Sequence, residues 1–211
     1  MATARYHSRN DQARRARRGI RVPPPALRIL RVIRVARSGR YFRVANPLWI
    51  DPLDPSYAKR YGGRWTPKGE FGALYLNATI DVAGANARWQ HRDRAIQLFD
   101  LRPESRPVLI TLAFERNDVV DAVTGAGLAD IGFPSSYPIG VSHAKCHAVA
   151  RTAYAREIHG IACRSAAEAT EASWIGEELA VFDHALPLAE IAPRRRFAEW
   201  YPDAKPDDAS G

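Results

Sequence analysis

The sequence contains little cysteine and no long apolar run. Its 211 residues include two cysteines, Cys146 and Cys163, which are too few for a disulfide framework, so a reducing compartment is the simpler interpretation. No stretch approaches the roughly 18 apolar residues of a membrane span. The arginine-rich N-terminus also lacks the uninterrupted apolar run of a secretory signal. These absences predict a cytoplasmic protein that does not associate with membranes.

Acidic residues are nearly absent from the first 40 positions. This segment holds 12 of the 31 basic residues, all of them arginine, and a single acid, Asp11, out of 23. The formal net charge of +8 therefore belongs to the N-terminal segment, and the rest of the chain is slightly acidic. A nucleic-acid-binding domain would need clustered basic side chains on its own surface. We therefore expect nucleic acid to be contacted only indirectly, through the basic segment or through a partner.

The length of the chain fits one hydrophobic core rather than two. Residues 1–39 predict a basic, Arg/Pro-rich, disordered tail, 40–200 a folded domain, and 201–211 a loose C-terminal tail. Residues 26–37 carry an arginine at every third position from Arg28. Because this spacing spreads the charges around a helix, the segment could form a basic helix, an extended arm or a solvated stretch.

The pattern of apolar residues predicts an α+β domain with a mixed central sheet and flanking helices, because strands and helices do not alternate regularly. The predicted strands are 40–45, 73–77, 107–115, a short buried strand that ends on Ser165, and 178–183. The predicted helices are 81–99, capped by Thr79, a short one at 119–123, and 144–158.

A glycine-rich turn carries the first candidate site. Gly62 and Gly63 let the backbone turn tightly and approach a ligand, and Arg64 then presents a fork of donors suited to a phosphate or a carboxylate. A structural turn is the equal alternative, with Arg64 in an ion pair and Trp65 covering the core.

Three further candidates are ambiguous when each is taken alone. Arg43 is the only charge within an apolar strand, and an edge strand that turns Arg43 toward water is the simpler explanation. Tyr75 in the middle of a strand and Ser165 at the end of another are common structural residues.

Metal-binding residues are sparse. His143, Cys146, His147 and His159 are of the types that zinc prefers, but a second conventional ligand pair is missing and the first three begin a predicted helix. We expect no metal. No nucleophile elbow and no phosphate-cradling Walker loop is present.

The ordered pattern of these residues resembles the RES domain family, which is named for its arginine, glutamate and serine. The resemblance covers residues 41 to about 185 and rests on four stretches: Tyr-Phe-Arg-Val at 41–44, Gly-Gly-Arg-Trp at 62–65, Leu-Tyr-Leu at 74–76 and Gly-Ile-Ala-Cys-Arg-Ser at 160–165. It implies a fold similar to that of ADP-ribosyltransferase toxins.

The resemblance also implies an activity and partners. Family members are typically toxins of toxin–antitoxin pairs that cleave the nicotinamide–ribose bond of NAD, with water or phosphate as acceptor, and some modify a protein. The implied partners are NAD, as substrate, and a small helix-turn-helix antitoxin that covers the site. The oligomeric state stays open, a homo-oligomer included.

Site roles follow from the same resemblance. Arg43 and Arg64 would hold the pyrophosphate of NAD within a site that includes Gly63 and Trp65. Tyr75 would stack on the nicotinamide or a ribose. Ser165 would hydrogen-bond the ligand or orient the catalytic carboxylate.

One position departs from the family. The family glutamate lies about eleven residues beyond the strand tyrosine, where this chain has Asn86. An amide brings no negative charge, so the stabilisation of an oxocarbenium-like ribose would be weakened. The site could use another carboxylate, for which Asp81, Glu177 and Glu178 are candidates, although Asp81 falls off the inward helix face.

Asn86 also fits a protein that is not a standard member of the family. The chain could bind a nucleotide without rapid turnover, as a regulatory module, or act on a different substrate, and Asn86 could be a satisfied core amide. A nucleic-acid binder driven by the basic tail is a further alternative.

Overall fold

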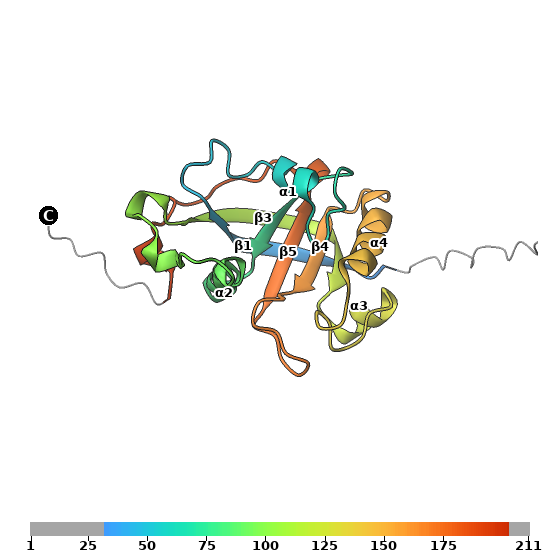
Figure 1. The fold of residues 1–211 in the computed structure, drawn as a ribbon. Helices are drawn as coiled ribbons and strands as arrows, with labels where there is room; N and C mark the ends of the chain where they lie inside the picture. Colours follow the sequence, from blue (N-terminus) through green and yellow to red (C-terminus); the bar gives the residue numbers. More distant parts are fainter. Residues whose placement is uncertain (1–31, 203–211) are drawn as a thin grey trace, which may run out of the picture.

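The fold is built from five strands and five α-helices in the computed structural model, which describes residues 32–202 (Figure 1). The strands are β1 Arg34–Ala45, β2 Ala73–Asn77, β3 Val108–Ala122, β4 Gly160–Arg164 and β5 Glu177–Phe182. The helices are α1 Ser56–Tyr61, α2 Ile80–His91, α3 Gly125–Asp130, α4 His143–Tyr154 and α5 Phe197–Trp200. Short 3-10 helices occupy Leu98–Asp100, Pro103–Ser105 and Asp183–Ala185.

The strands form one mixed sheet in the order β1-β2-β5-β4-β3, and β3 pairs with β1 to close it into a barrel. The β3–β4 pair is parallel and the other pairs are antiparallel. The longest ladder joins β1 to β3, from Arg34 opposite Val120 to Ala45 opposite Val108. The predicted α+β class with a mixed sheet is thus confirmed, and the sheet is closed.

Apolar side chains divide between the inside of the barrel and two outer layers, because successive strand residues point to opposite faces. The inner cluster includes Leu74, Leu76, Ile110, Leu112 and Leu179. One outer cluster lies under α4 and the other under α2 and α5. In Figure 1, α2 and α4 lie on different sides of the β5–β4 pair. A strip of the outer face of β2 and β5 is therefore left between the two layers.

The first strand begins earlier than predicted. The sequence placed its start at residue 40 and assigned residues 34–39 to the tail, but β1 begins at Arg34 and these residues lie opposite β3. The charged side chains explain the difference: Arg34 forms an ion pair with Asp118 at 3.2 Å and Arg37 one with Glu177 at 2.7 Å. An arginine-rich stretch can form a strand when its charges find partners across the sheet. Predictions for residues 1–31 lie outside the described residues.

The predicted helix at 119–123 is wrong. Residues Val119–Ala122 continue β3 and pair in parallel with Gly160–Cys163 of β4, as suits β-branched residues at buried sheet positions. The helix follows instead as α3, where Gly127 N–H donates to the Thr124 hydroxyl at 3.1 Å.

Other element boundaries also shift. Helix α2 ends at His91 rather than near residue 99, and α1 and α5 were not predicted. Tyr201, assigned to the loose C-terminal tail, is 5% exposed and stacks on Phe197 with 4.6 Å between ring centroids, whereas residues 203–211 lie outside the description. Between residues 32 and 202, no helix has the length and apolar character needed to span a membrane.

Candidate functional site

A cavity of about 250 Å³ lies on the strip between the two outer layers. It brings together Arg43 from β1, Tyr75 and Asn77 from β2, Glu178 from β5 and Asn86 from α2. Asn77 and Glu178 are direct cross-strand neighbours, and Tyr75 is two residues before Asn77, so strand alternation directs all three to the same outer face. Sequence positions far apart in the chain therefore meet at one site.

Arg43 is a half-buried cation that lines this cavity. Its Nε donates to Pro52 O at 2.6 Å and its Nη1 to Tyr75 O at 3.3 Å. Burial lowers the pKa of Arg43 to about 10, while the nearby Asp51 and Asp54 act to raise it, so the guanidinium is charged at neutral pH. Because β1 pairs with both β2 and β3, Arg43 does not face water on an edge strand. Its charge is held by neutral carbonyls at the cavity wall.

The glycine-rich turn is wrapped around the Tyr75 hydroxyl. Tyr75 Oη accepts from Trp65 N–H at 2.9 Å and lies 3.2 Å from Thr66 Oγ1. A Cβ on Gly63 would lie 2.6 Å from Tyr75 Oη and 2.7 Å from Thr66 Oγ1, so only glycine fits this close approach. Burial raises the pKa of Tyr75 to about 12. The hydroxyl is therefore neutral and engaged, and the ring lines the cavity.

Most residues of the turn do not line the cavity. Trp65 is fully buried, and its Nε1 donates to Cys163 Sγ at 3.2 Å. Gly62 lines the cavity, whereas Gly63, Arg64 and Trp65 are not among its lining residues. The structure thus places Trp65 in the core and gives Gly63 a role in shaping the turn.

Arg64 is half-buried beside this wall. Its side chain makes no hydrogen bond or ion pair with any other described residue. Burial acts to lower the pKa of Arg64, but nearby groups that include Tyr137 and Glu178 raise it overall. A charged guanidinium therefore stands within electrostatic reach of Glu178.

Ser165 closes the loop that leads into β5. It is fully buried, its Oγ accepts from Ala167 N–H at 3.2 Å and its N–H donates to Gly176 O at 2.8 Å. Ser165 is not among the residues that line the cavity. Its geometry fixes the start of β5, where Glu177 and Glu178 stand, so it can position a carboxylate without touching a ligand.

Asn86 belongs to a short chain of amides. Its Nδ2 donates to Asn77 Oδ1 at 2.8 Å, and Asn77 Nδ2 donates to Phe42 O at 3.0 Å. The Oδ1 atom of Asn86 accepts no hydrogen bond from the described residues and is an available acceptor at the cavity. Asn86 is half-buried, so it is both a satisfied donor and a lining residue.

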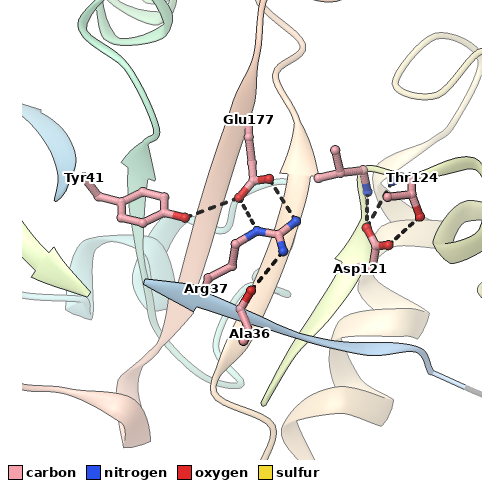
Figure 2. Close-up of polar contacts among 7 residues, drawn as sticks. Ala36, Arg37, Tyr41, Asp121, Thr124 and Glu177 are labelled. Carbon is pink, nitrogen blue, oxygen red and sulfur yellow. Dashed lines mark hydrogen bonds and ion pairs between the residues drawn. The ribbon is translucent and has the colours of Figure 1, made fainter. Parts of the chain in front are cut away.

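The three candidate carboxylates have different surroundings. Figure 2 shows Glu177 accepting two bonds from Arg37, at 2.7 and 3.0 Å, and one from Tyr41 at 3.4 Å. Asp81 is exposed at the start of α2 and does not line the cavity. Glu178 lines it, and its carboxylate makes no hydrogen bond or ion pair with another described residue. Of the three, Glu178 alone is placed to act on a ligand there.

The sequence did not single out the outer rim of the cavity. Trp49, Asp54 and Tyr57 line it and come from the Pro/Asp-rich stretch and α1. Asp54 accepts hydrogen bonds from the backbone N–H and the hydroxyl of Ser56, so it is engaged locally. The cluster of aromatic residues in a polar loop was the feature of the sequence that could have indicated this rim.

The histidine and cysteine side chains of the described residues do not gather into a metal-binding group. Residues 32–202 contain no group of three or more His, Cys, Asp or Glu side chains that could hold an ion. Burial raises the pKa of Cys146 to about 11 and that of Cys163 well above its ordinary value, which disfavours the thiolate that a metal needs. His147 Nε2 lies 2.8 Å from Gly63 O, so this ring supports the glycine turn.

Comparison with known proteins identifies the class. The RES domain family model matches residues 31–202, and the chain belongs to this family. No curated protein gives a significant match. A chain of the crystal structure of the M. tuberculosis MbcT-MbcA toxin-antitoxin complex is similar, with a TM-score of 0.66 and 19% identity over 80% of this chain and 91% of that one. At this identity the likeness shows the fold.

Proposed function

We propose that this chain is a RES-type toxin that binds NAD and cleaves its nicotinamide–ribose bond. One observation carries the proposal: the cavity holds a half-buried cation, Arg43, and a carboxylate, Glu178, that makes no ion pair with another described residue, with Tyr75 and Asn86 on the same wall. A cation and a carboxylate at one small site suit a substrate with a pyrophosphate and a ribose that becomes positive during the reaction. Membership of the RES family supports the choice of NAD.

The pyrophosphate is held by arginine. Arg43 donates charge-assisted hydrogen bonds to it, and Arg64, whose donors bind no other described residue, adds a second positive charge nearby. The Tyr75 ring packs against the nicotinamide or its ribose, and Asn86 Oδ1 accepts from a ribose hydroxyl. These contacts fix the ribose C1′ atom within the cavity.

Positive charge develops on the ribose as the bond to nicotinamide breaks, and a carboxylate stabilises it. The C1′–N bond breaks, its electron pair leaves with nicotinamide as a neutral molecule, and positive charge spreads over C1′ and the ring oxygen. Glu178 stabilises that charge in place of the glutamate that the family carries at the position of Asn86. Water or phosphate then attacks C1′ and loses a proton, giving ADP-ribose or its phosphate ester; a protein acceptor would give ADP-ribosylation instead.

The family also supports a partner and a setting. We assign the chain to a toxin–antitoxin pair whose antitoxin is a small helix-turn-helix protein that covers the cavity, and the similar solved chain comes from a toxin–antitoxin complex. Leu48 and Ile50, 70% and 103% exposed, line a hollow that shares Arg43 and Trp49 with the cavity, and they give such a partner apolar contacts. The reaction would take place in the cytoplasm, on a fold related to that of ADP-ribosyltransferase toxins.

The arginine-rich segment is tested separately. If it contributes to the antitoxin contact, deletion of residues 1–31 weakens complex formation, measured by size-exclusion chromatography; an intact complex refutes that role. The deletion must end before Arg34, because β1 and the Arg37–Glu177 ion pair begin there.

A second function is favoured by one observation. Asn86, at the position where the family has its glutamate, donates a hydrogen bond to Asn77 at 2.8 Å. A neutral, hydrogen-bonded amide at this position suits a module that binds a nucleotide without turnover. Binding of NAD without nicotinamide release identifies this second function.

The proposed reaction is tested by chromatography of NAD incubated with the full chain, with and without phosphate. Release of nicotinamide with ADP-ribose indicates hydrolysis, and a phosphate-dependent product indicates phosphorolysis. Arg43→Met removes the charge and keeps the stem, and Arg40→Met, at an exposed position of the same strand, is the control. Equal activity of the two variants would contradict the role of Arg43.

A further inference from the structure

The cavity is too small for a whole dinucleotide. Its volume of about 250 Å³ lies below the roughly 300–1,000 Å³ of most small-molecule sites. A second hollow of about 640 Å³ adjoins it, and the two share Arg43, Trp49, Asp54 and Tyr57 as lining residues. We call this second hollow the aromatic groove. A long ligand that reaches into the cavity can extend along it.

Three exposed aromatic rings form a row in the aromatic groove. The centroids of Trp49 and Tyr57 lie 6.3 Å apart with 29° between the planes, and those of Tyr57 and Tyr61 lie 4.7 Å apart at 43°. The residues are 42%, 63% and 55% exposed. Tyr57 and Tyr61 are four residues apart on α1, which places them on one helix face. Clustered exposed rings of this kind mark a binding surface.

The charges of the groove suit a nucleotide. Arg43 Cζ lies 6.0 Å from the centroid of Trp49, and Arg60 Cζ lies 5.3 Å from that of Tyr61. Asp51 and Asp54 also line the groove and can accept hydrogen bonds from ribose hydroxyls. Arg43, at the junction with the cavity, can meet a phosphate from either side. The flat aromatic rings suit a base, the arginine suits a phosphate, and the carboxylate acceptors suit a sugar.

We infer that the aromatic groove binds the adenine nucleoside end of the substrate, with the base stacked on Trp49 and Tyr57. This inference rests on the proposed function and adds where the non-reacting half of NAD binds. The pyrophosphate then lies at Arg43, and the nicotinamide ribose enters the cavity toward Glu178. Stacking is insensitive to base identity, so hydrogen bonds that Asp51 and Asp54 accept from the sugar hydroxyls contribute to selectivity.

The test compares substrates with and without the adenylate half. Trp49→Ala is measured on NAD and on nicotinamide mononucleotide, which has the same scissile bond and no adenine. The matched control is Trp89→Ala, because Trp89 is 44% exposed on α2 and lies outside the groove. We expect Trp49→Ala to raise KM for NAD about tenfold or more and to raise KM for the mononucleotide much less, because the mononucleotide has no adenine to stack on Trp49. Trp49→Phe should keep most of the affinity.

A binding measurement separates this inference from the proposed function. Calorimetric titration with ADP-ribose and with ribose 5-phosphate needs no turnover, so it gives an answer even if the natural chain releases no nicotinamide. Weaker binding of ADP-ribose alone in Trp49→Ala supports the groove. Equal losses for both ligands, no loss, or no ADP-ribose binding by the natural chain would overturn it. Loss of antitoxin binding with ADP-ribose affinity unchanged would assign the groove to a protein partner and also overturn the inference.

Discussion

Replacing Glu178 by glutamine tests the carboxylate on which the proposed chemistry depends. The substitution keeps the shape of the side chain and removes its charge. Two opposite unit charges about 4 Å apart interact by about 4 kcal/mol at an effective dielectric constant of about 20, which suits a half-buried group. Loss of that interaction from the transition state lowers kcat by about 10²- to 10³-fold, as for other preorganised charges. Nicotinamide release under saturating NAD is the assay.

Three further variants make this result specific. Glu115→Gln, at an exposed position of β3, controls for the loss of a carboxylate and should retain full activity. The double change Asn86→Glu with Glu178→Gln moves the carboxylate across the cavity to the family position, and we expect it to recover part of the lost rate. In the single variant Asn86→Glu, the new carboxylate faces Asn77 Oδ1 and Glu178. We therefore expect its kcat not to exceed that of the natural chain. A kcat of Glu178→Gln within threefold of the natural value would refute the assignment of Glu178.

Three predictions concern stability and reactivity. Gly63→Ala should lower the free energy of unfolding by about 1–3 kcal/mol because its Cβ meets Tyr75 Oη and Thr66 Oγ1, whereas Gly125→Ala, with open space around it, should not; thermal unfolding separates the two. Burial raises the pKa of Tyr41 and Tyr75 to about 12, so between pH 10 and pH 12 the unfolded chain releases protons that the folded chain keeps, and stability should fall there by up to about 1.4 kcal/mol per pH unit for each. Denaturant titrations across this range check the slope, and a flat profile would contradict it. Because both buried thiols have raised pKa values, Cys146 and Cys163 should react with a thiol reagent at pH 8 only after unfolding; rapid reaction of the folded protein would show that a thiol is accessible.

The residues that carry local signals were predictable from the sequence. The strand around Tyr75 and the Thr79 cap of α2 each follow from a short stretch of residues, and the structure has both. The strand predicted to end at Ser165 is β4, which ends one residue earlier at Arg164. Barrel closure by the β1–β3 pair was not predictable, because it depends on contacts between segments about 75 residues apart. The ion pairs that hold Arg34 and Arg37 in β1 are equally non-local. A prediction from local propensity therefore assigned residues 34–39 to a tail, although they belong to β1.

The candidate site shows the same division. Arg43, Tyr75 and Asn86 were selected from the sequence, and the cavity brings them together. The sequence could not choose between Glu177 and Glu178, which are adjacent on β5. Strand alternation turns one toward Arg37 and the other into the cavity, and this choice is visible only once the partners of β5 are known. The burial of Trp65 likewise became clear from its contact with Cys163, 98 positions away.

Nicotinamide release from NAD by the natural chain is the decisive measurement for the proposed function. We predict many molecules of nicotinamide per molecule of protein, with release strongly reduced in Arg43→Met and in Glu178→Gln. NAD that binds in a calorimeter and is recovered unchanged after long incubation would contradict the proposed cleavage and identify a nucleotide-binding module.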